Sequence, residues 1–458
     1  MRKALLLTIF LLSGIWSEAQ AAATLYGPTQ LGGGANDLRG GTTSEFGMER
    51  RTYKVGMTSN GVPLIMARRR TTQYYDLFWT GNGGTTWSTM TNVFQSQSGN
   101  GSHNEGMYCF GDSAYLTSST GTTTDTSLRI VLIRGDTIKS ITDTVMRGTE
   151  MRNSGAMACA MPLGSTRIFG ITRIENATAD SLVVFQSNAA FALNGTYTRI
   201  EKSTTIPGYG LAVPLTWSGG TKGGALQFDQ TAQDLFWYDS ATGINSALHT
   251  SFLNYTGNAY DKFYIVAMKD SMFATIWQNS VTGGSDSLRV KRCYVTGTAG
   301  GSPALTNIDS FVIETEAPIR DGASANPLLS YLNGTDTLFA FYKFWPDTSI
   351  DCSYDIGLKI FNGTSWGSRS TFYDMTGEDT LAFLHAPPRI YNIAGNIRHF
   401  VTYTDSTNTR DSLHLLMDVL NVGSGTTNVR NSIKKATLKK VSAIFDSPDI
   451  WRPEHEVF

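Results

Sequence analysis

The stretch Asp76-Leu77-Phe78-Trp79 places an aspartate directly before an apolar run with the character of a β-strand. The same marker recurs six more times, at Asp125, Asp180, Asp234, Asp286, Asp355 and Asp411. The spacing is nearly even, and only the step from Asp286 to Asp355 is clearly longer than the others. A period of roughly 50 residues without a helical pattern inside it is typical of β-propeller blades, and the single long step indicates a loop insertion.

A polar turn lies upstream of each aspartate and separates two apolar runs, such as 261–268 and 272–277. Glycine and asparagine supply the positive φ angles that tight hairpins require. Each unit therefore predicts four antiparallel strands, A to D, with the turn between A and B and the aspartate at the start of C. The turns are Ser59-Asn60-Gly61, Gly111-Asp112, Gly164-Ser165, Gly219-Gly220, Lys269-Asp270, Asn333-Gly334 and Gly395-Asn396.

Seven such units over residues 50–435 predict an all-β fold, a seven-bladed β-propeller of four-stranded antiparallel blades, with six blades as the alternative. A single blade cannot bury both of its faces, whereas a closed ring of blades can. Ring closure requires either the N-terminal segment 22–49 or the tail after Lys435 to pair with an outer blade, and the sequence leaves both open. Residues 436–458 are expected to form a C-terminal tail.

The segment 1–21 has the pattern of a secretory signal peptide. Arg2 and Lys3 are followed by an apolar run over residues 4–16 and by the small-x-small site Ala19-Gln20-Ala21. We expect the mature chain to begin near Ala22 and to be exported, either outside the cell or to the periplasm. No later segment approaches about 18 uninterrupted apolar residues, so we expect no membrane insertion.

Composition narrows the range of partners. The net charge is −1 and charged residues make up 16% of the chain, which argues against nucleic acid as the main partner. The four cysteines, Cys109, Cys159, Cys293 and Cys352, form no Cys-x-x-Cys pair, which argues against a zinc site and favours buried free thiols. We expect a monomer without a cofactor or a metal site.

One hairpin carries a family resemblance. The stretch Thr80-Gly81-Asn82-Gly83-Gly84-Thr85-Thr86-Trp87 resembles the Asp box of the sialidase-like (BNR/Asp-box repeat) β-propellers, with Asn82 at the aspartate position. In such a turn a short polar side chain accepts hydrogen bonds from backbone N–H groups, and the tryptophan packs into the blade. Weaker versions occur in the third and sixth units, as Asn194-Gly195-Thr196-Tyr197 and Asn362-Gly363-Thr364-Ser365-Trp366.

The resemblance implies a protein that acts on carbohydrate, with the boxes in a structural role away from the active site. Sialidases use three arginines, a Tyr–Glu pair and an aspartate. This chain departs from them, because Arg50-Arg51-Thr52-Tyr53 stands where Arg-Ile-Pro is expected and because it has seven units rather than six. Some polysaccharide lyases resemble the seven-bladed layout and use His, Tyr and Arg.

The connections from strand D of one unit to strand A of the next surround the channel mouth, where propeller ligands usually bind. Arginine binds a carboxylate bidentately, Glu or Asp can serve as acid or base, and His can serve as a base near neutral pH. For each such residue the plain alternative is a solvated loop side chain. The catalytic candidates are His103, Glu105, Tyr209 and Asp321, and the substrate-binding candidates are Arg51, Arg152, Arg320 and His385.

Two functions remain open from the sequence. The first is a secreted glycoside hydrolase or polysaccharide lyase for an acidic glycan, which requires these side chains to converge in one pocket. The second is a non-catalytic propeller for glycan binding, adhesion or cell-surface assembly, which predicts scattered polar groups and an aromatic-lined face. The repeated aspartates are expected to be strand-start residues rather than metal ligands.

Overall fold

The computed structural model describes the strands of the chain and many of the turns between them. All of the described elements are β-strands. Among the described residues, no helix is long and apolar enough to span a membrane. The described ranges are 24–32, 55–68, 74–80, 88–95, 106–121, 126–134, 139–147, 158–163, 167–175, 180–187, 197–203, 212–217, 222–229, 232–240, 245–253, 262–279, 286–296, 303–315, 325–345, 355–373, 380–407 and 410–421.

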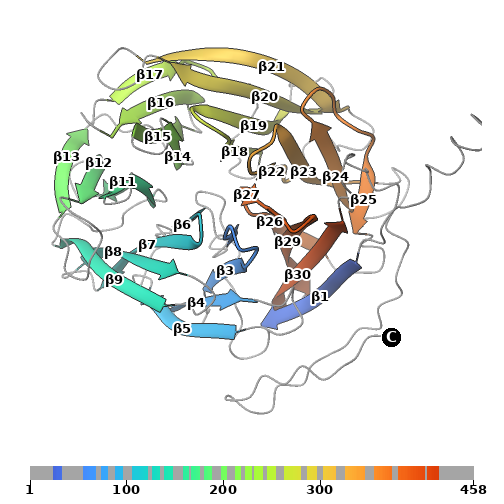
Figure 1. Cartoon of the computed structure of the whole chain (residues 1–458), viewed down its shortest axis with the longest axis horizontal. Coiled ribbons are helices and arrows are strands. Elements are labelled where there is room, and N and C mark those ends of the chain that lie inside the picture. Colours follow the sequence, from blue (N-terminus) through green and yellow to red (C-terminus); the bar gives the residue numbers. More distant parts are fainter. Residues whose placement is uncertain are drawn as a thin grey trace, which may run out of the picture.

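Within these ranges the strands pair into seven sheets arranged around a ring (Figure 1). The first three sheets each contain four consecutive antiparallel strands, which agrees with the predicted order A to D. They are β2 (Val55–Met57), β3 (Pro63–Arg68), β4 (Tyr74–Trp79) and β5 (Ser88–Gln95); β6 (Gly106–Phe110), β7 (Ser113–Gly121), β8 (Thr126–Arg134) and β9 (Lys139–Arg147); and β10 (Ala158–Leu163), β11 (Arg167–Glu175), β12 (Asp180–Ser187) and β13 (Tyr197–Ser203).

The next three sheets continue the pattern, and the sixth gains an extra strand. They are β14 (Ala212–Trp217), β15 (Lys222–Asp229), β16 (Asp234–Asp239) and β17 (Asn245–His249); β18 (Phe263–Ala267), β19 (Met272–Asn279), β20 (Ser287–Thr296) and β21 (Ala304–Glu314); and β22 (Leu328–Leu332), β23 (Thr337–Phe344), β24 (Asp355–Asn362) and β25 (Ser370–Tyr373), to which β27 (Arg389–Ile390) adds next to β22. The all-β class and the propeller arrangement predicted from the repeat are confirmed.

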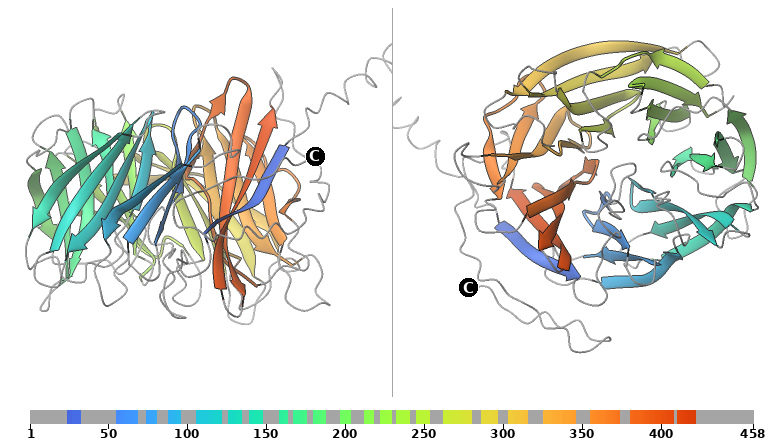
Figure 2. Two further views of the ribbon diagram at one scale, coloured as in Figure 1. Left: turned by 90° about the horizontal axis from the view of Figure 1, so that it is seen from below. Right: turned by 180° about the vertical axis from the view of Figure 1, so that it is seen from behind.

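The seventh sheet includes a strand from the N-terminal segment. It consists of β26 (Thr380–His385), β28 (Asn392–Ile393), β29 (Asn396–Thr407), β30 (Arg410–Asn421) and β1 (Thr24–Gly32). β1 pairs antiparallel with β30, with Thr24 opposite Val419 and Tyr26 opposite Met417, and lies on the outer side of this sheet (Figure 2). Of the two closures that the sequence left open, the described residues use the N-terminal one. Strand pairing thus includes residues N-terminal to residue 50, the start of the propeller predicted from the repeat.

The two sequence markers occupy the predicted places in the strands. Each repeated aspartate lies at the start of the third strand of its sheet or within two residues of it. In the described A–B turns, Gly61, Gly111 and Gly334 have positive φ angles of 77°, 59° and 80°. Glycine adopts this backbone region without strain, which explains its place in these turns.

Two of the repeated aspartates accept hydrogen bonds from the backbone in or next to the outer strand of their sheet. Asp76 Oδ1 accepts a hydrogen bond from the backbone N–H of Asn92 at 2.9 Å, and Asp234 Oδ1 accepts one from Ser251 at the same distance. Both donors are non-glycine residues with positive φ, 59° and 50°. The carboxylates therefore hold a backbone conformation that is otherwise unfavourable, which is a structural role as expected.

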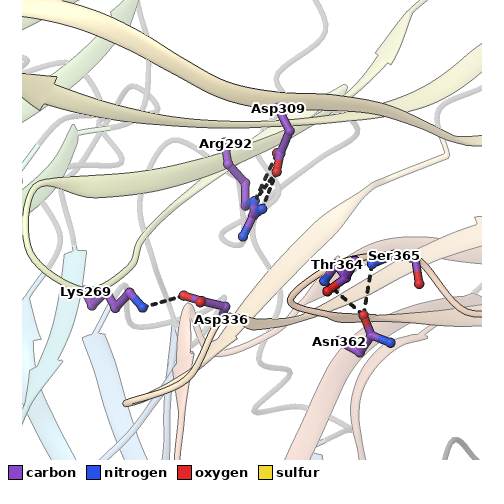
Figure 3. Close-up of polar contacts among 7 residues, drawn as sticks. All are labelled: Lys269, Arg292, Asp309, Asp336, Asn362, Thr364 and Ser365. Atoms are coloured by element: carbon purple, nitrogen blue, oxygen red, sulfur yellow. Dashed lines mark hydrogen bonds and ion pairs between the residues drawn. The ribbon is translucent and has the colours of Figure 1, made fainter.

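The sixth sheet contains a turn with the local contacts expected of the box-like hairpins. Asn362 Oδ1 accepts hydrogen bonds from the backbone N–H groups of Thr364 at 3.0 Å and Ser365 at 2.9 Å (Figure 3). Gly363 has a φ of 97°, and the Trp366 ring lies 5.4 Å from the ring of Phe361. The corresponding stretch of the first unit, residues 81–87, lies outside the described residues.

Aromatic contacts join neighbouring sheets. The rings of Phe228 and Phe263 connect the fourth and fifth sheets at a centroid distance of 4.5 Å, and those of Phe311 and Phe361 connect the fifth and sixth at 5.3 Å. Contacts of this kind bury large apolar surfaces and add favourable ring geometry. Part of the core therefore lies between neighbouring sheets.

Candidate functional site

The connections that flank the innermost strands differ between the two faces of the ring. Because each sheet is antiparallel, its A–B turn lies at one face and its D–A connection at the other. The A–B connections are short: 111–112 is among the shortest and 58–62 is the longest. The D–A connections are longer, with 374–379 as the shortest and 33–54 as the longest. The face with the longer connections has more chain available for binding a ligand.

Most of the candidates for this face lie outside the described residues, so their roles remain predictions. These are Arg51, His103, Glu105, Arg152, Tyr209, Arg320 and Asp321. His385 is described, and it is the last residue of β26, opposite Thr402 in β29. Its side chain is 2% exposed, so it lies inside the seventh sheet rather than in a D–A connection.

At the opposite end of the inner strands, part of the seventh sheet crosses to the sixth. The stretch 386–391, here the crossing segment, leaves the antiparallel ladder after β26, and its β27 pairs in parallel with β22. The backbone N–H of Tyr331 donates to the carbonyl oxygen of Pro388 at 3.0 Å, and the hydroxyl of Tyr264 donates to that of Ala386 at 3.1 Å. These bonds fix the segment against the fifth and sixth sheets, inside the ring (Figure 1).

Two prolines explain why the chain leaves its own sheet at this point. Pro387 and Pro388 have no backbone N–H, so neither can donate to the ladder with β29. Their carbonyl groups remain available, and Ser330 Oγ donates to that of Pro387 at 2.6 Å. The proline pair within an expected inner strand is the sequence signal that could have marked this feature.

The crossing segment positions an arginine among three tyrosines. Arg389 Nη2 donates to the carbonyl oxygen of Met268 at 3.3 Å, and its guanidinium carbon lies 5.8 Å from the centroid of the Tyr331 ring. The guanidinium also interacts with Tyr391, through a side-chain contact, and with Tyr108, which lies on β6. We call Arg389, Tyr391, Tyr331 and Tyr108 the channel arginine cluster.

The ionisation states in this cluster follow from burial and mutual interaction. Burial acts to lower the pKa of Arg389, but the electrostatic influence of the three tyrosines raises it, and the net shift is upward. Burial raises the pKa of Tyr391 to about 12, and burial also raises the pKa of Tyr331. At neutral pH the cluster therefore contains one cation and neutral phenols that can donate hydrogen bonds.

Three other cations of the fifth and sixth sheets have carboxylate partners. Arg292 Nε donates to both oxygens of Asp309 at 2.9 Å (Figure 3). Glu314 binds Lys359 at 3.0 Å and Arg369 at 3.2 Å. Arg389, in contrast, has no carboxylate partner among the described residues.

Metal binding and catalysis by a cysteine thiolate find no support in the described part of the chain. No group of three or more His, Cys, Asp or Glu residues there could hold a metal ion. Cys109 and Cys293 are free and buried, as expected, and burial raises the pKa of each thiol to about 12. Such thiols remain protonated at neutral pH and are poor nucleophiles. The side chains of Cys159 and Cys352 lie outside the described residues.

Comparison with known proteins gives structural likenesses only. No family model matches the chain, and no curated protein matches its sequence. Among solved structures, the BP39L lectin from Burkholderia pseudomallei has a TM-score of 0.47 at 9% identity, covering 78% of this chain and 97% of its own. The polysaccharide lyase Uly1 has a TM-score of 0.43 at 7% identity, covering 88% and 100%.

A third structure, the catalytic domain of the Coprinopsis cinerea GH62 α-L-arabinofuranosidase, has a TM-score of 0.31 at 8% identity and covers 57% of this chain and 89% of its own. At these scores the propeller assignment rests on the sheets of this chain rather than on the likenesses.

Proposed function

We propose that the chain is an exported, closed seven-bladed propeller of the sialidase-like type that acts on an acidic extracellular glycan at the face of its D–A connections. The observation that carries this proposal is the asymmetry of the two faces. Of the connections that flank the innermost strands, the A–B connections are no longer than 58–62, whereas the D–A connections extend up to the length of 33–54. The strands of the described residues pair into seven sheets, and we take each sheet as one blade.

The residue types in the long connections suit a carboxylate-bearing sugar. Arg51, Arg152 and Arg320 belong to three different D–A connections, and a closed ring directs such connections toward one mouth. Arginine is suited to a uronate or sialate because its planar guanidinium matches a carboxylate. Glu105, His103, Asp321 and Tyr209 are our candidates for proton transfer in a hydrolase or lyase reaction.

A non-catalytic glycan-binding or adhesion propeller is the second candidate. The channel arginine cluster favours it, because it brings together a cation and aromatic phenols without a carboxylate or histidine among its four members. Such a set can bind an anionic sugar, and neutral phenols with raised pKa values are poor proton acceptors at neutral pH.

The test is an activity and binding screen of the purified exported protein on sialosides and uronate-containing polysaccharides. New reducing ends indicate glycosidic cleavage, and ultraviolet absorbance of an unsaturated uronate identifies a lyase. We expect Arg152→Ala and Arg320→Ala to lose turnover or affinity, whereas Arg369→Ala, which lies in an ion pair with Glu314, serves as the control. Turnover of neutral glycans alone, or unchanged behaviour of both variants, would contradict an acidic substrate at this face.

A further inference from the structure

We propose that the channel arginine cluster is a second ligand site, at the A–B end of the channel, which binds a carboxylate or sulfate group carried by a sugar. This site lies apart from the face assigned under the proposed function and does not depend on it. Arg389 lies opposite Tyr331 near the end of β22, shortly before the A–B turn of the sixth sheet. The candidate residues of the D–A connections follow the opposite ends of the strands.

The charge of Arg389 is the first argument. A guanidinium removed from water is costly unless an anion or several hydrogen-bond acceptors compensate for it. Among the described residues it has one carbonyl acceptor, Met268, and contacts with tyrosines, but no carboxylate. The positive charge of this cluster is therefore available to an external anion. Arg292 illustrates the alternative, since the carboxylate of Asp309 accepts hydrogen bonds from its guanidinium group.

Hydrogen-bonding capacity points to the same kind of ligand. A guanidinium group has five N–H donors, and the hydrogen bonds known for Arg389 go to the Met268 carbonyl and to the side chain of Tyr391. The hydroxyl of Tyr331 is buried and has no acceptor for its proton among the described residues. Neutral phenols and guanidinium N–H groups together provide donors, which favours a ligand rich in acceptor oxygens. Carboxylates and sulfate esters meet this requirement.

The surroundings favour an anion attached to a sugar over a free inorganic ion. The aromatic rings of Tyr108, Tyr331 and Tyr391 give the cluster an apolar lining next to its polar groups. Small-molecule sites combine mainly apolar walls with a few placed polar groups. The carboxylate or sulfate would bind Arg389, and the C–H groups of the ring would contact a tyrosine face.

The backbone of the site is also held in place. Carbonyl groups of the crossing segment are hydrogen-bonded to the fifth and sixth sheets, which limits the motion of the backbone that carries Arg389. Pre-ordering of a binding group reduces the entropy lost when a ligand binds. Arg389 is of intermediate burial, whereas the three tyrosines around it are buried.

The experiment is calorimetric titration of the full exported protein with three probes: methyl β-glucuronide, galactose 6-sulfate and the neutral methyl β-glucoside. We expect binding of one or both anionic probes and none of the neutral probe. The anionic probe that binds identifies the carboxylate or the sulfate as the ligand group. Binding is expected to weaken with rising salt, because the interaction is between charges.

Two variants locate the binding. Arg389→Gln removes the cation and is expected to lower the affinity at least tenfold, while Tyr391→Phe keeps the ring, removes one hydroxyl and is expected to cause a smaller loss. Arg369→Gln removes a guanidinium that is already paired with Glu314 and is expected to bind the probes like the unaltered protein.

These measurements test the second ligand site independently of the proposed function. Failure of both anionic probes to bind, or binding unchanged in a folded Arg389→Gln protein, would overturn it, whatever happens at the D–A face. If Arg389→Gln does not fold, Arg389→Lys replaces it: the lysine retains the charge but loses the planar fork, and unaltered binding of both Arg389→Lys and Tyr391→Phe would overturn the proposal. If only Arg152→Ala or Arg320→Ala abolishes binding of the anionic probes, the anion binds at the face of the D–A connections instead.

Discussion

The contact between the first two blades can be tested with a single added methyl group. A Cβ placed on Gly56 in β2 would lie 2.3 Å from Sγ of Cys109 in β6, whereas the next atoms, Cys109 Cβ and Met107 Sδ, are 3.5 and 3.6 Å away. Carbon atoms in normal contact are about 3.5–4.0 Å apart, so the sulfur overlaps the added methyl by roughly 1 Å or more. We expect Gly56→Ala to lower the free energy of unfolding by about 1–3 kcal/mol, the usual cost of overpacking.

Removing the sulfur should relieve this clash. Cys109→Ala alone is expected to cost about 1 kcal/mol, because it leaves a small space in a packed interface. In Gly56→Ala/Cys109→Ala the nearest atom to the new methyl would be the β-carbon at 3.5 Å, an ordinary contact. The double variant should therefore be more stable than the sum of the single effects predicts, by about 1–2 kcal/mol.

The assay is urea unfolding of the four proteins of this cycle, followed by tryptophan fluorescence. Gly111→Ala is the matched control, because this glycine has a φ of 59° and no atom within 4 Å of an added Cβ, so its cost arises from backbone strain alone. The loss of unfolding free energy caused by Gly111→Ala should be the same with and without Cys109→Ala. Equal costs of Gly56→Ala in the presence and absence of the Cys109 sulfur would refute the packing of β2 against β6.

Three further predictions follow from local contacts. Asn362→Ala removes two hydrogen bonds, of 3.0 and 2.9 Å, and should lower the unfolding free energy by about 1–2 kcal/mol, whereas Asn362→Asp should retain most of it; equal losses in urea unfolding would argue against the turn. Cys109 and Cys293 have pKa values of about 12 and are buried, so peptide mapping should find them unmodified by iodoacetamide at pH 8 in the folded protein and modified after unfolding; rapid labelling of the folded protein would contradict their burial. Mass spectrometry of the exported protein should find an N-terminus near Ala22, and a mature chain that retains Met1 would contradict the expected leader.

Local sequence signals predicted the strands well because each depends on a few neighbouring residues. The glycines of the A–B turns adopt positive φ angles that their lack of a side chain permits, as Gly61 and Gly334 show. An aspartate at the start of a third strand acts over a single hairpin, from Asp76 to Asn92. Such contacts recur with the repeat, and so their sequence pattern is visible without the ring.

The candidate site was less predictable, because its members come from different blades. Tyr331 and Arg389 lie far apart in the sequence, yet β22 and β27 are adjacent in the ring. Tyr108 is more distant still and contributes from the second sheet. None of these residues occurs in a D–A connection, where sequence position leads one to expect ligand-binding groups. His385 is buried in its own sheet, and its role as a substrate-binding residue stays a prediction.

By itself the sequence determined the all-β class, the repeat of four-stranded units, the positions of their turns and the structural role of the aspartates. These follow from backbone geometry and from hydrogen bonds within one hairpin, both of which are encoded by adjacent residues. Tertiary structure decided that β1 closes the last sheet and that the crossing segment leaves the seventh sheet for the sixth. The physical reason is that an unpaired strand edge and a proline pair restrict which backbone hydrogen bonds can form. Only the arrangement of the sheets in space determines which partner is near enough to form them.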